Sequence, residues 1–188
     1  MHKMRPVKKV ALLHDLCGVG KAALTNMVPV LSVMGIEACP IPTILLSTHT
    51  GGYGKPAMEK ISTTYIRECA DHYVANQVTF DLIFVGYLGS EGMIEAVEYF
   101  LSCFPDTEVI IDPIMGDHGK TYATYTPDMC QEMKKLVKLA DIVTPNMTEA
   151  CILTDTDYHE AHWKMKDICA VAEKLAEEGP QKVVITGI

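Results

Sequence analysis

The stretch Leu82-Ile-Phe-Val-Gly-Tyr-Leu-Gly89 joins a short apolar run to a glycine-rich corner, and it decides the fold class. A helical stretch from Gly92 to Phe104 follows it, and a second apolar run, Val109-Ile-Ile-Asp112, ends at a polar residue. Short apolar runs that alternate with longer helical stretches are typical of βα units in a mostly parallel sheet. The pattern predicts a three-layer, Rossmann-like α/β fold with helices on both faces of the sheet.

The same alternation extends to both ends of the chain. The expected strands are 10–13, 36–39 and 43–46 (strand or extended loop), 82–85, 109–112, 142–144 and 183–186, and the expected helices are 22–34, 57–76, 92–104, 129–139 and 161–178. Each expected strand ends at a polar or glycine-rich corner. Ligands of open α/β sheets bind outside the carboxyl ends of the strands, so these corners form the candidate site.

Length and composition fit one α/β domain, residues 1–188. The chain is 48% hydrophobic and 21% charged, which is enough apolar material for a sizeable core. Its last residues, Thr186-Gly-Ile188, form another strand-end corner with no helix after it. We therefore expect the domain to be incomplete at its carboxyl end.

Charge and cysteine usage exclude several classes of function. The net charge is −8 and the 16 Lys and Arg residues are scattered, which argues against nucleic-acid binding. The apolar run after the basic amino terminus, Val10–Leu13, is too short for a signal sequence or a membrane span, so a cytoplasmic protein is expected. Seven separated cysteines without a C-x-x-C pair indicate reduced thiols rather than disulfides or a zinc site.

The segment Gly18-Val-Gly-Lys21 invites comparison with a P-loop but lacks two of its functional positions. Asp15 stands where a P-loop has its first glycine, and Ala22 replaces the hydroxyl residue that would reach magnesium. The third glycine of a dinucleotide fingerprint is also missing. The segment instead predicts a tight turn from strand to helix.

Two acidic segments follow expected strands. The first is Asp112-Pro-Ile-Met-Gly-Asp117 and the second is Thr144-Pro-Asn-Met-Thr-Glu149. Taken singly, Asp112 fits a strand-end cap, and Asn146 with Glu149 fits a helix capping box. Their convergence at neighbouring strand exits favours oxygen ligands for magnesium and a nucleotide.

Four runs, in order and at matching spacing, resemble those of pyridoxal kinases, members of the ribokinase-like superfamily. They are Ser47-Thr-His-Thr-Gly-Gly-Tyr53, Val85-Gly-Tyr-Leu-Gly89, Asp112-Pro-Ile-Met-Gly-Asp117 and Asp141-Ile-Val-Thr-Pro-Asn-Met-Thr-Glu149. The resemblance covers nearly the whole chain. The first and third runs together distinguish pyridoxal kinases from sugar kinases of the same fold.

The resemblance implies ATP-dependent phosphorylation of the 5′-hydroxymethyl group of pyridoxal, pyridoxamine or pyridoxine, a step of vitamin B6 salvage. It also implies magnesium, a monovalent cation (K⁺ or Na⁺) and a homodimer. Matching the motifs assigns substrate contacts to Asp15, His49, Thr50, Tyr87 and Tyr125, ATP contacts to Asp112, Asn146, Glu149 and Thr186, and metal contacts to Asp117, Glu149 and Thr144.

The chain departs from these kinases at two places. Asp15 stands near a position where many members have a serine, and it could either cap the following turn or meet a cationic vitamer such as pyridoxamine. The glycine-threonine-glycine-aspartate segment that supplies the anion hole and the catalytic base has no counterpart in residues 1–188. We therefore expect a fragment and assign no catalytic residue within it.

Two alternatives remain open. A hydroxymethylpyrimidine or phosphomethylpyrimidine kinase shares the fold and a hydroxymethyl heteroaromatic substrate, although the runs at 47–53 and 112–117 favour a pyridoxal kinase. The second alternative is a non-catalytic protein that binds pyridoxal or a nucleotide. A reading frame that continues past Ile188 into a glycine-rich turn with an aspartate would exclude it.

Overall fold

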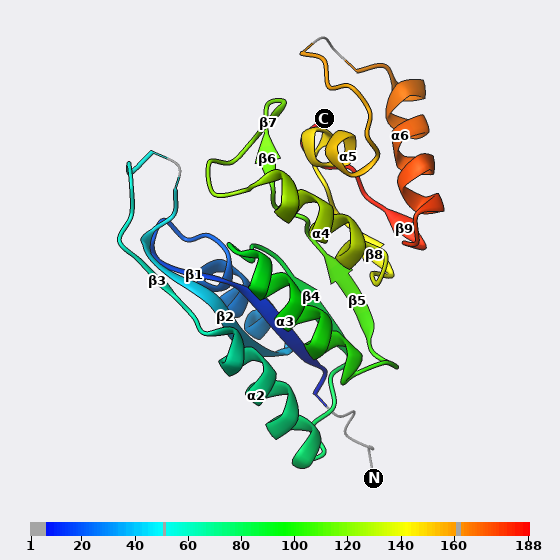
Figure 1. Cartoon of the computed structure of the whole chain (residues 1–188). Helices are drawn as coiled ribbons and strands as arrows, with labels where there is room; N and C mark the ends of the chain where they lie inside the picture. The colour runs from blue at the N-terminus through cyan, green and yellow to red at the C-terminus, as the bar shows by residue number, and fades with distance from the viewer. Residues whose placement is uncertain (1–6, 51, 161–162) are drawn as a thin grey trace.

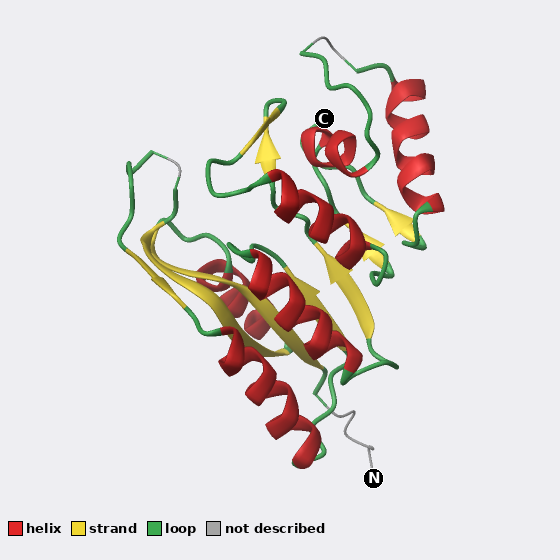
Figure 2. Cartoon of the chain, in the orientation of Figure 1, coloured by secondary structure: helices red, strands yellow, loops and turns green. Residues whose placement is uncertain are grey.

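A seven-stranded sheet forms the middle layer of the protein (Figures 1 and 2). The computed structural model describes residues 7–50, 52–160 and 163–188. The strand order is β3-β2-β1-β4-β5-β8-β9, and β3 alone runs antiparallel to its neighbour. The strands are β1 (Lys9–Val19), β2 (Glu37–Thr48), β3 (Met58–Lys60), β4 (Leu82–Val85), β5 (Glu108–Ile111), β8 (Ile142–Val143) and β9 (Lys182–Val183). The mostly parallel α/β sheet that the sequence predicts is confirmed.

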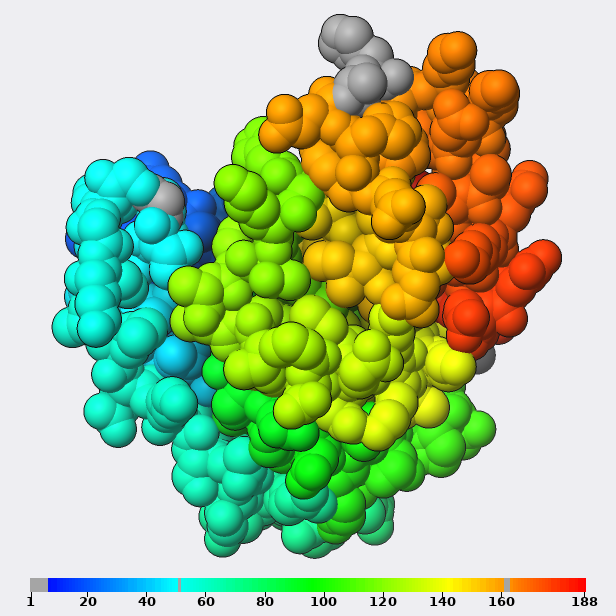
Figure 3. All heavy atoms as spheres, turned by 45° about the horizontal axis from the view of Figure 1, so that its top comes forward, coloured from blue at the N-terminus to red at the C-terminus, as the bar shows by residue number. Residues whose placement is uncertain are grey.

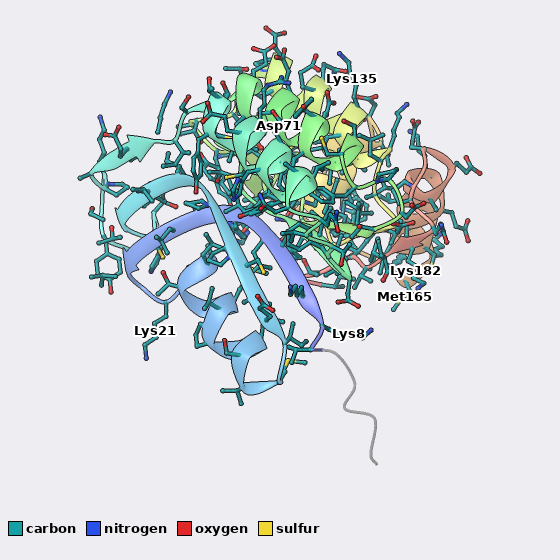
Figure 4. All side chains as sticks on the ribbon, turned by 90° about the horizontal axis from the view of Figure 1, so that it is seen from below. Lys8, Lys21, Asp71, Lys135, Met165 and Lys182 are labelled. Carbon is teal, nitrogen blue, oxygen red and sulfur yellow. The ribbon has the colours of Figure 1, made fainter. Side chains whose placement is uncertain are left out.

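Helices cover both faces of this sheet, as Figure 4 shows for the helices around β1 and β2. They are α1 (Leu24–Val33), α2 (Thr63–Ala75), α3 (Glu91–Ser102), α4 (Pro127–Val137), α5 (Met147–Leu153) and α6 (Met165–Glu177). A small hairpin, β6 (Gly116–Asp117) with β7 (Lys120–Thr121), stands apart from the main sheet. The expected start of the last helix, at residues 161–162, lies outside the described residues.

Alternating residues of β1 face two separate hydrophobic clusters. Leu12 packs with Leu24 of α1 on one face of the sheet, and Leu13 joins the larger cluster under α2, α3 and α4 on the other. The centre of the larger cluster is Phe100 of α3, which is fully buried and lies 5.1 Å, centroid to centroid, from Phe104. This period of two is what a strand buried on both faces requires.

The first strand is longer than the sequence predicts. Pairing with β2 shifts by one residue between His14 and Leu16 and then resumes as far as Val19, so the tight turn expected at Gly18–Lys21 is present only in the second half of that segment. The turn comes later, at Gly20, where φ is +118°. The extra residue of the β-bulge at the register shift is in β2, where Thr43 and Ile44 together face Asp15, and a bulge bends the strand that carries it.

The second strand is continuous where two short pieces were expected. Pro40 and Pro42 lie inside β2, opposite Leu12 and His14 of β1. Prolines are tolerated there because β3 pairs only with Ile44–Leu46, which leaves the first half of β2 at the edge of the sheet. The expected helix at 57–76 is likewise shorter, since 58–60 forms β3 and the Ser62 hydroxyl caps α2 by accepting from the Thr64 amide.

The strand order reverses beside β1. The chain moves from β1 outward to β2 and β3 on one side, then returns to place β4, β5, β8 and β9 on the other. At such a reversal the connections leave in opposite directions, which opens a crevice at the carboxyl ends of the strands. No helix in the described part of the chain is long and apolar enough to cross a membrane.

We expect Phe100→Ala to lower the free energy of unfolding by about 3–5 kcal/mol, because it opens a cavity among packed aromatic rings. Urea denaturation followed by circular dichroism measures this. Val33→Ala removes an α1 side chain that is 89% exposed and is the control, with an expected change below about 0.5 kcal/mol. Equal losses in the two variants would contradict the cluster as the main core.

Candidate active site

Asp15 lies at the reversal point, opposite the β-bulge that Thr43 and Ile44 form in β2. Its side chain is buried, and its Oδ1 lies 2.8 Å from Nδ1 of His14. A buried carboxylate is costly unless a donor or a cation meets it. Asp15 therefore stands ready to accept a hydrogen bond from a ligand in the crevice.

The segment after β2 approaches the same corner. The His49 amide donates to the Val19 carbonyl at 3.0 Å, and the His49 ring packs edge-on against Tyr53 at 5.1 Å. The ring occupies the space beside Gly20, where an added Cβ would lie 1.9 Å from it. Thr50 is exposed on the same segment, and Gly51 lies outside the described residues. The long β1 ladder thus carries the 47–50 segment to the crevice.

Two tyrosines form an aromatic side of the crevice. Tyr87 follows β4, and its hydroxyl donates to Thr124 Oγ1 at 2.9 Å while its carbonyl accepts from the Thr43 hydroxyl at 2.7 Å. The Tyr125 ring lies 6.2 Å from it. Tyr125 is 5% exposed, its hydroxyl has no partner among the described residues, and burial raises its pKa. An unpaired buried hydroxyl lowers the stability of the folded state.

Carboxylates gather on the other side, after β5 and β8. Burial raises the pKa of Asp112, against the opposing effects of His14 and of a hydrogen bond from the Thr144 side chain. Burial also raises the pKa of Glu149 to about 7, and the charge of Asp112 adds to the shift, although hydrogen bonds from the amides of Asn146 and Met115 oppose it. The two acids therefore share one poorly solvated region.

The capping box predicted for Asn146 and Glu149 is present at the start of α5. The Glu149 amide donates to Asn146 Oδ1 at 3.0 Å, and the Asn146 amide donates to Glu149 Oε2 at 2.8 Å. The other oxygen of Glu149 accepts from the Met115 amide at 3.1 Å, and the Asn146 side-chain amide donates to the Gly116 carbonyl at 2.9 Å. Capping thus also ties α5 to the segment after β5.

Asp117 and Thr186 lie farther out. Asp117 belongs to the β6–β7 hairpin rather than to the main sheet, and its carboxylate accepts from the His118 amide at 2.7 Å on an exposed surface. Thr186 is exposed beyond β9, where it bridges to Asn146 and its amide donates to the Pro145 carbonyl at 2.9 Å. Both residues border the acidic side without entering its buried part.

The predicted residues thus fall into two neighbouring groups at one end of the sheet. In Figure 1 the segment after β2 and the β6–β7 hairpin project from this same end, and the space-filling view is hollowed between them (Figure 3). Two residues of the site were not predicted from the sequence: His14, which is buried next to Asp15, and Gly86, against which the His14 ring packs. The reversal of strand order beside β1 would have pointed to both residues, but this reversal cannot be recognised in the sequence.

The acidic group fits magnesium. No three His, Cys, Asp or Glu side chains converge on one point in the residues that the structure describes, which argues against a cage made by protein alone. Magnesium commonly takes only one or two carboxylates and completes its shell with water and phosphate oxygens. Burial raises the pKa of both Asp112 and Glu149, and a divalent cation beside them would favour their charged forms.

The Glu149 carboxyl makes stability depend on pH. Its folded-state pKa of about 7 lies above its ordinary value of 4.5, so the folded protein binds more protons than the unfolded chain between these values. The contribution is fully present below pH 4.5 and is lost as the pH rises through 7. Without divalent cations, we expect the free energy of unfolding to fall by on the order of 1–3 kcal/mol from about pH 5 to about pH 8.

Glu149→Gln tests this assignment by removing the titrating group. Its urea midpoint should depend less on pH than that of the unmodified protein, although its stability at low pH is lower because one backbone amide loses its acceptor. Glu59→Gln, at an exposed position in β3, is the matched charge control. The same pH slope in Glu149→Gln and the unmodified protein would contradict the assignment.

Comparison with known proteins gives one family. The model of the phosphomethylpyrimidine kinase family matches residues 28–188. Curated relatives include a pyridoxal kinase from Arabidopsis thaliana, 30% identical over 165 residues, which cover 84% of this chain and 51% of the relative. Another from Leifsonia xyli is 27% identical and covers 96% of this chain and 64% of the relative. The chain thus spans between half and two thirds of their length.

Solved structures agree with the sequence relatives. A structure described as a phosphomethylpyrimidine kinase from Bacteroides thetaiotaomicron is 36% identical, with a TM-score of 0.90 over 99% of this chain and 64% of that one. A pyridoxal kinase from Lactobacillus plantarum is 30% identical, with a TM-score of 0.88 over 97% of this chain and 65% of that one. Together with the match over residues 28–188, these likenesses confirm the ribokinase-like fold, and the chain belongs to the phosphomethylpyrimidine kinase family.

Proposed function

We propose that this chain supplies the residues that bind the vitamer and the metal in a kinase. The kinase transfers phosphate from ATP to the 5′-hydroxymethyl group of pyridoxal, pyridoxamine or pyridoxine. The observation that carries the proposal is that an aromatic corner, Tyr87 and Tyr125, and an acidic corner, Asp112 and Glu149, lie at the same end of the sheet beside the reversal of strand order. The Bacteroides thetaiotaomicron relative was also crystallised with pyridoxal, at 37% identity and a TM-score of 0.89.

The aromatic corner suits a flat, polar heteroaromatic ring. Tyr87 would pack on or near the ring, and Tyr125 would offer its unpartnered hydroxyl as a hydrogen-bond donor or acceptor. Asp15 would accept from a donor on the vitamer, with a preference for the amine of pyridoxamine. His49 and Thr50, on the segment after β2, would contact the ring of the vitamer from its outer side.

The acidic corner suits the triphosphate and its cations. Asp117, Glu149 and Thr144 would hold the metal ions, and Asp112, Asn146 and Thr186 would border the nucleotide. Magnesium would neutralise charge on the transferred phosphoryl group. In this arrangement the capping box serves the site indirectly, because it fixes the orientation of the Glu149 carboxylate.

No catalytic base is assigned among residues 1–188. In the resembling kinases the base belongs to a glycine-threonine-glycine-aspartate segment without a counterpart here. Our proposal therefore concerns binding and orientation by this chain, and it includes use of K⁺ or Na⁺, a homodimer and a cytoplasmic location by likeness to those kinases.

The second candidate is phosphorylation of hydroxymethylpyrimidine or its phosphate. The family match and the Bacteroides thetaiotaomicron structure favour it. ATP consumption by the intact protein with pyridoxal, pyridoxamine and hydroxymethylpyrimidine separates the candidates. A higher kcat/KM with the pyrimidine would overturn the B6 assignment.

Tyr87→Ala should weaken pyridoxal binding about tenfold, because it removes the ring that would pack on the vitamer. Tyr87→Phe is the matched control. It keeps the ring, loses only the hydrogen bond to Thr124, and should bind pyridoxal within about threefold of the unmodified protein. Fluorescence titration with pyridoxal measures both affinities. Equal binding by all three proteins would show that Tyr87 is not at the vitamer.

A further inference from the structure

His14 lies at the reversal point, on β1 beside β4. It is the residue of β1 just before the register shift with β2, and it is 7% exposed. Its ring stacks on Phe84 of β4, with centroids 6.1 Å apart and an interplanar angle of 12°. A Cβ at Gly86 would lie 2.2 Å from the ring, so only glycine at this position leaves space for it. Packing therefore fixes the orientation of the imidazole.

The Nδ1 atom of this ring faces backbone amides from both sides of the crevice. It lies 2.8 Å from the amide nitrogen of Asp15 and 3.4 Å from that of Tyr87. The Asp15 amide belongs to β1, opposite the bulge in β2, and the Tyr87 amide belongs to the corner after β4. One acceptor atom thus links the two segments that border the reversal, with the shorter bond to Asp15 as the stronger of the two.

The same nitrogen lies 2.8 Å from Asp15 Oδ1. A single imidazole nitrogen cannot accept from an amide and donate to a carboxylate at once, so the two contacts require different tautomers. As an acceptor, Nδ1 provides a hydrogen-bond partner for the backbone amide of Tyr87, which lies outside the strands. In this role the lone pair of Nδ1 faces Asp15 Oδ1 at 2.8 Å, so the carboxylate receives no hydrogen bond from the ring and needs a donor from elsewhere, which a ligand could supply.

We propose that His14 is a positioning residue, whose unprotonated Nδ1 holds Asp15 and Tyr87 in place for the vitamer. The inference deepens the proposed function and rests on it only for the identity of the ligand. The imidazole does not touch the reacting atoms. It acts through the backbone of the two residues that would meet the aromatic ring.

Two substitutions separate positioning from packing. In His14→Asn, the side-chain oxygen branches from Cγ as Nδ1 does, so the acceptor is retained. In His14→Gln, the acceptor is one bond farther out. Both variants lose the stacking on Phe84, so a loss of thermal stability common to both reports packing alone.

The first test measures the protein without ligand by NMR. Long-range proton–nitrogen spectra should show the Nδ1 of His14 unprotonated, and a proton on Nδ1 would overturn the proposal. Amide hydrogen exchange at Asp15 and Tyr87 should be about tenfold faster in His14→Gln and within about threefold of the unmodified protein in His14→Asn. Equal exchange rates in the two variants would also overturn it.

The second test measures pyridoxal affinity by fluorescence titration. We expect binding about tenfold weaker in His14→Gln and nearly unchanged in His14→Asn. His72→Gln, at an exposed position on α2, is the control and should match the unmodified protein. If the unmodified protein binds no pyridoxal, the proposed ligand is wrong, while the tautomer and the exchange rates still decide the role of His14. Equally weak pyridoxal binding in both His14 variants would show that His14 contributes only packing, and it would overturn the positioning role.

Discussion

The return of the chain to the far side of β1 is the constraint on which the rest of the structure depends. Once β2 and β3 occupy one side, β4 has to pair on the other, and the two connections diverge at the carboxyl end of β1. That divergence leaves room for a ligand and requires polar groups beside an open corner. The β-bulge of β2 lies at this point, where Thr43 and Ile44 face the single residue Asp15.

This arrangement buries two carboxyl groups, and their burial is unfavourable for the charged forms. Asp112 and Glu149 lie in a poorly solvated region, and the raised pKa of each carboxyl measures the preference for its neutral form. The protein offsets the cost at Glu149 with two backbone amides, those of Asn146 and Met115. A cation bound at this corner would favour the charged forms of both carboxyls.

The sequence predicted what local patterns encode. Leu82–Val85 has the predicted bounds, and the capping box of Asn146 and Glu149 forms as expected, because each depends on residues within a few positions. Long-range pairing decided the rest. The stretch at 58–60 reads as helix by composition but pairs with β2, and β1 continues past Gly18 because β2 offers it a partner. Asp117 was expected at an exit of the main sheet, yet it lies in a separate hairpin.

His14 shows why part of the site escaped prediction. In the sequence it is one polar residue at the end of an apolar run, and nothing nearby indicates that its ring will lie against Gly86, 72 positions later. Only the pairing of β1 with β4 brings them together, and it also brings the Tyr87 amide to the same nitrogen. Gly86 reads as a turn former, but its lack of a side chain serves the histidine. A residue that links segments of two different strands can be recognised only from their positions in the folded chain. The motifs that identify the family therefore do not include His14.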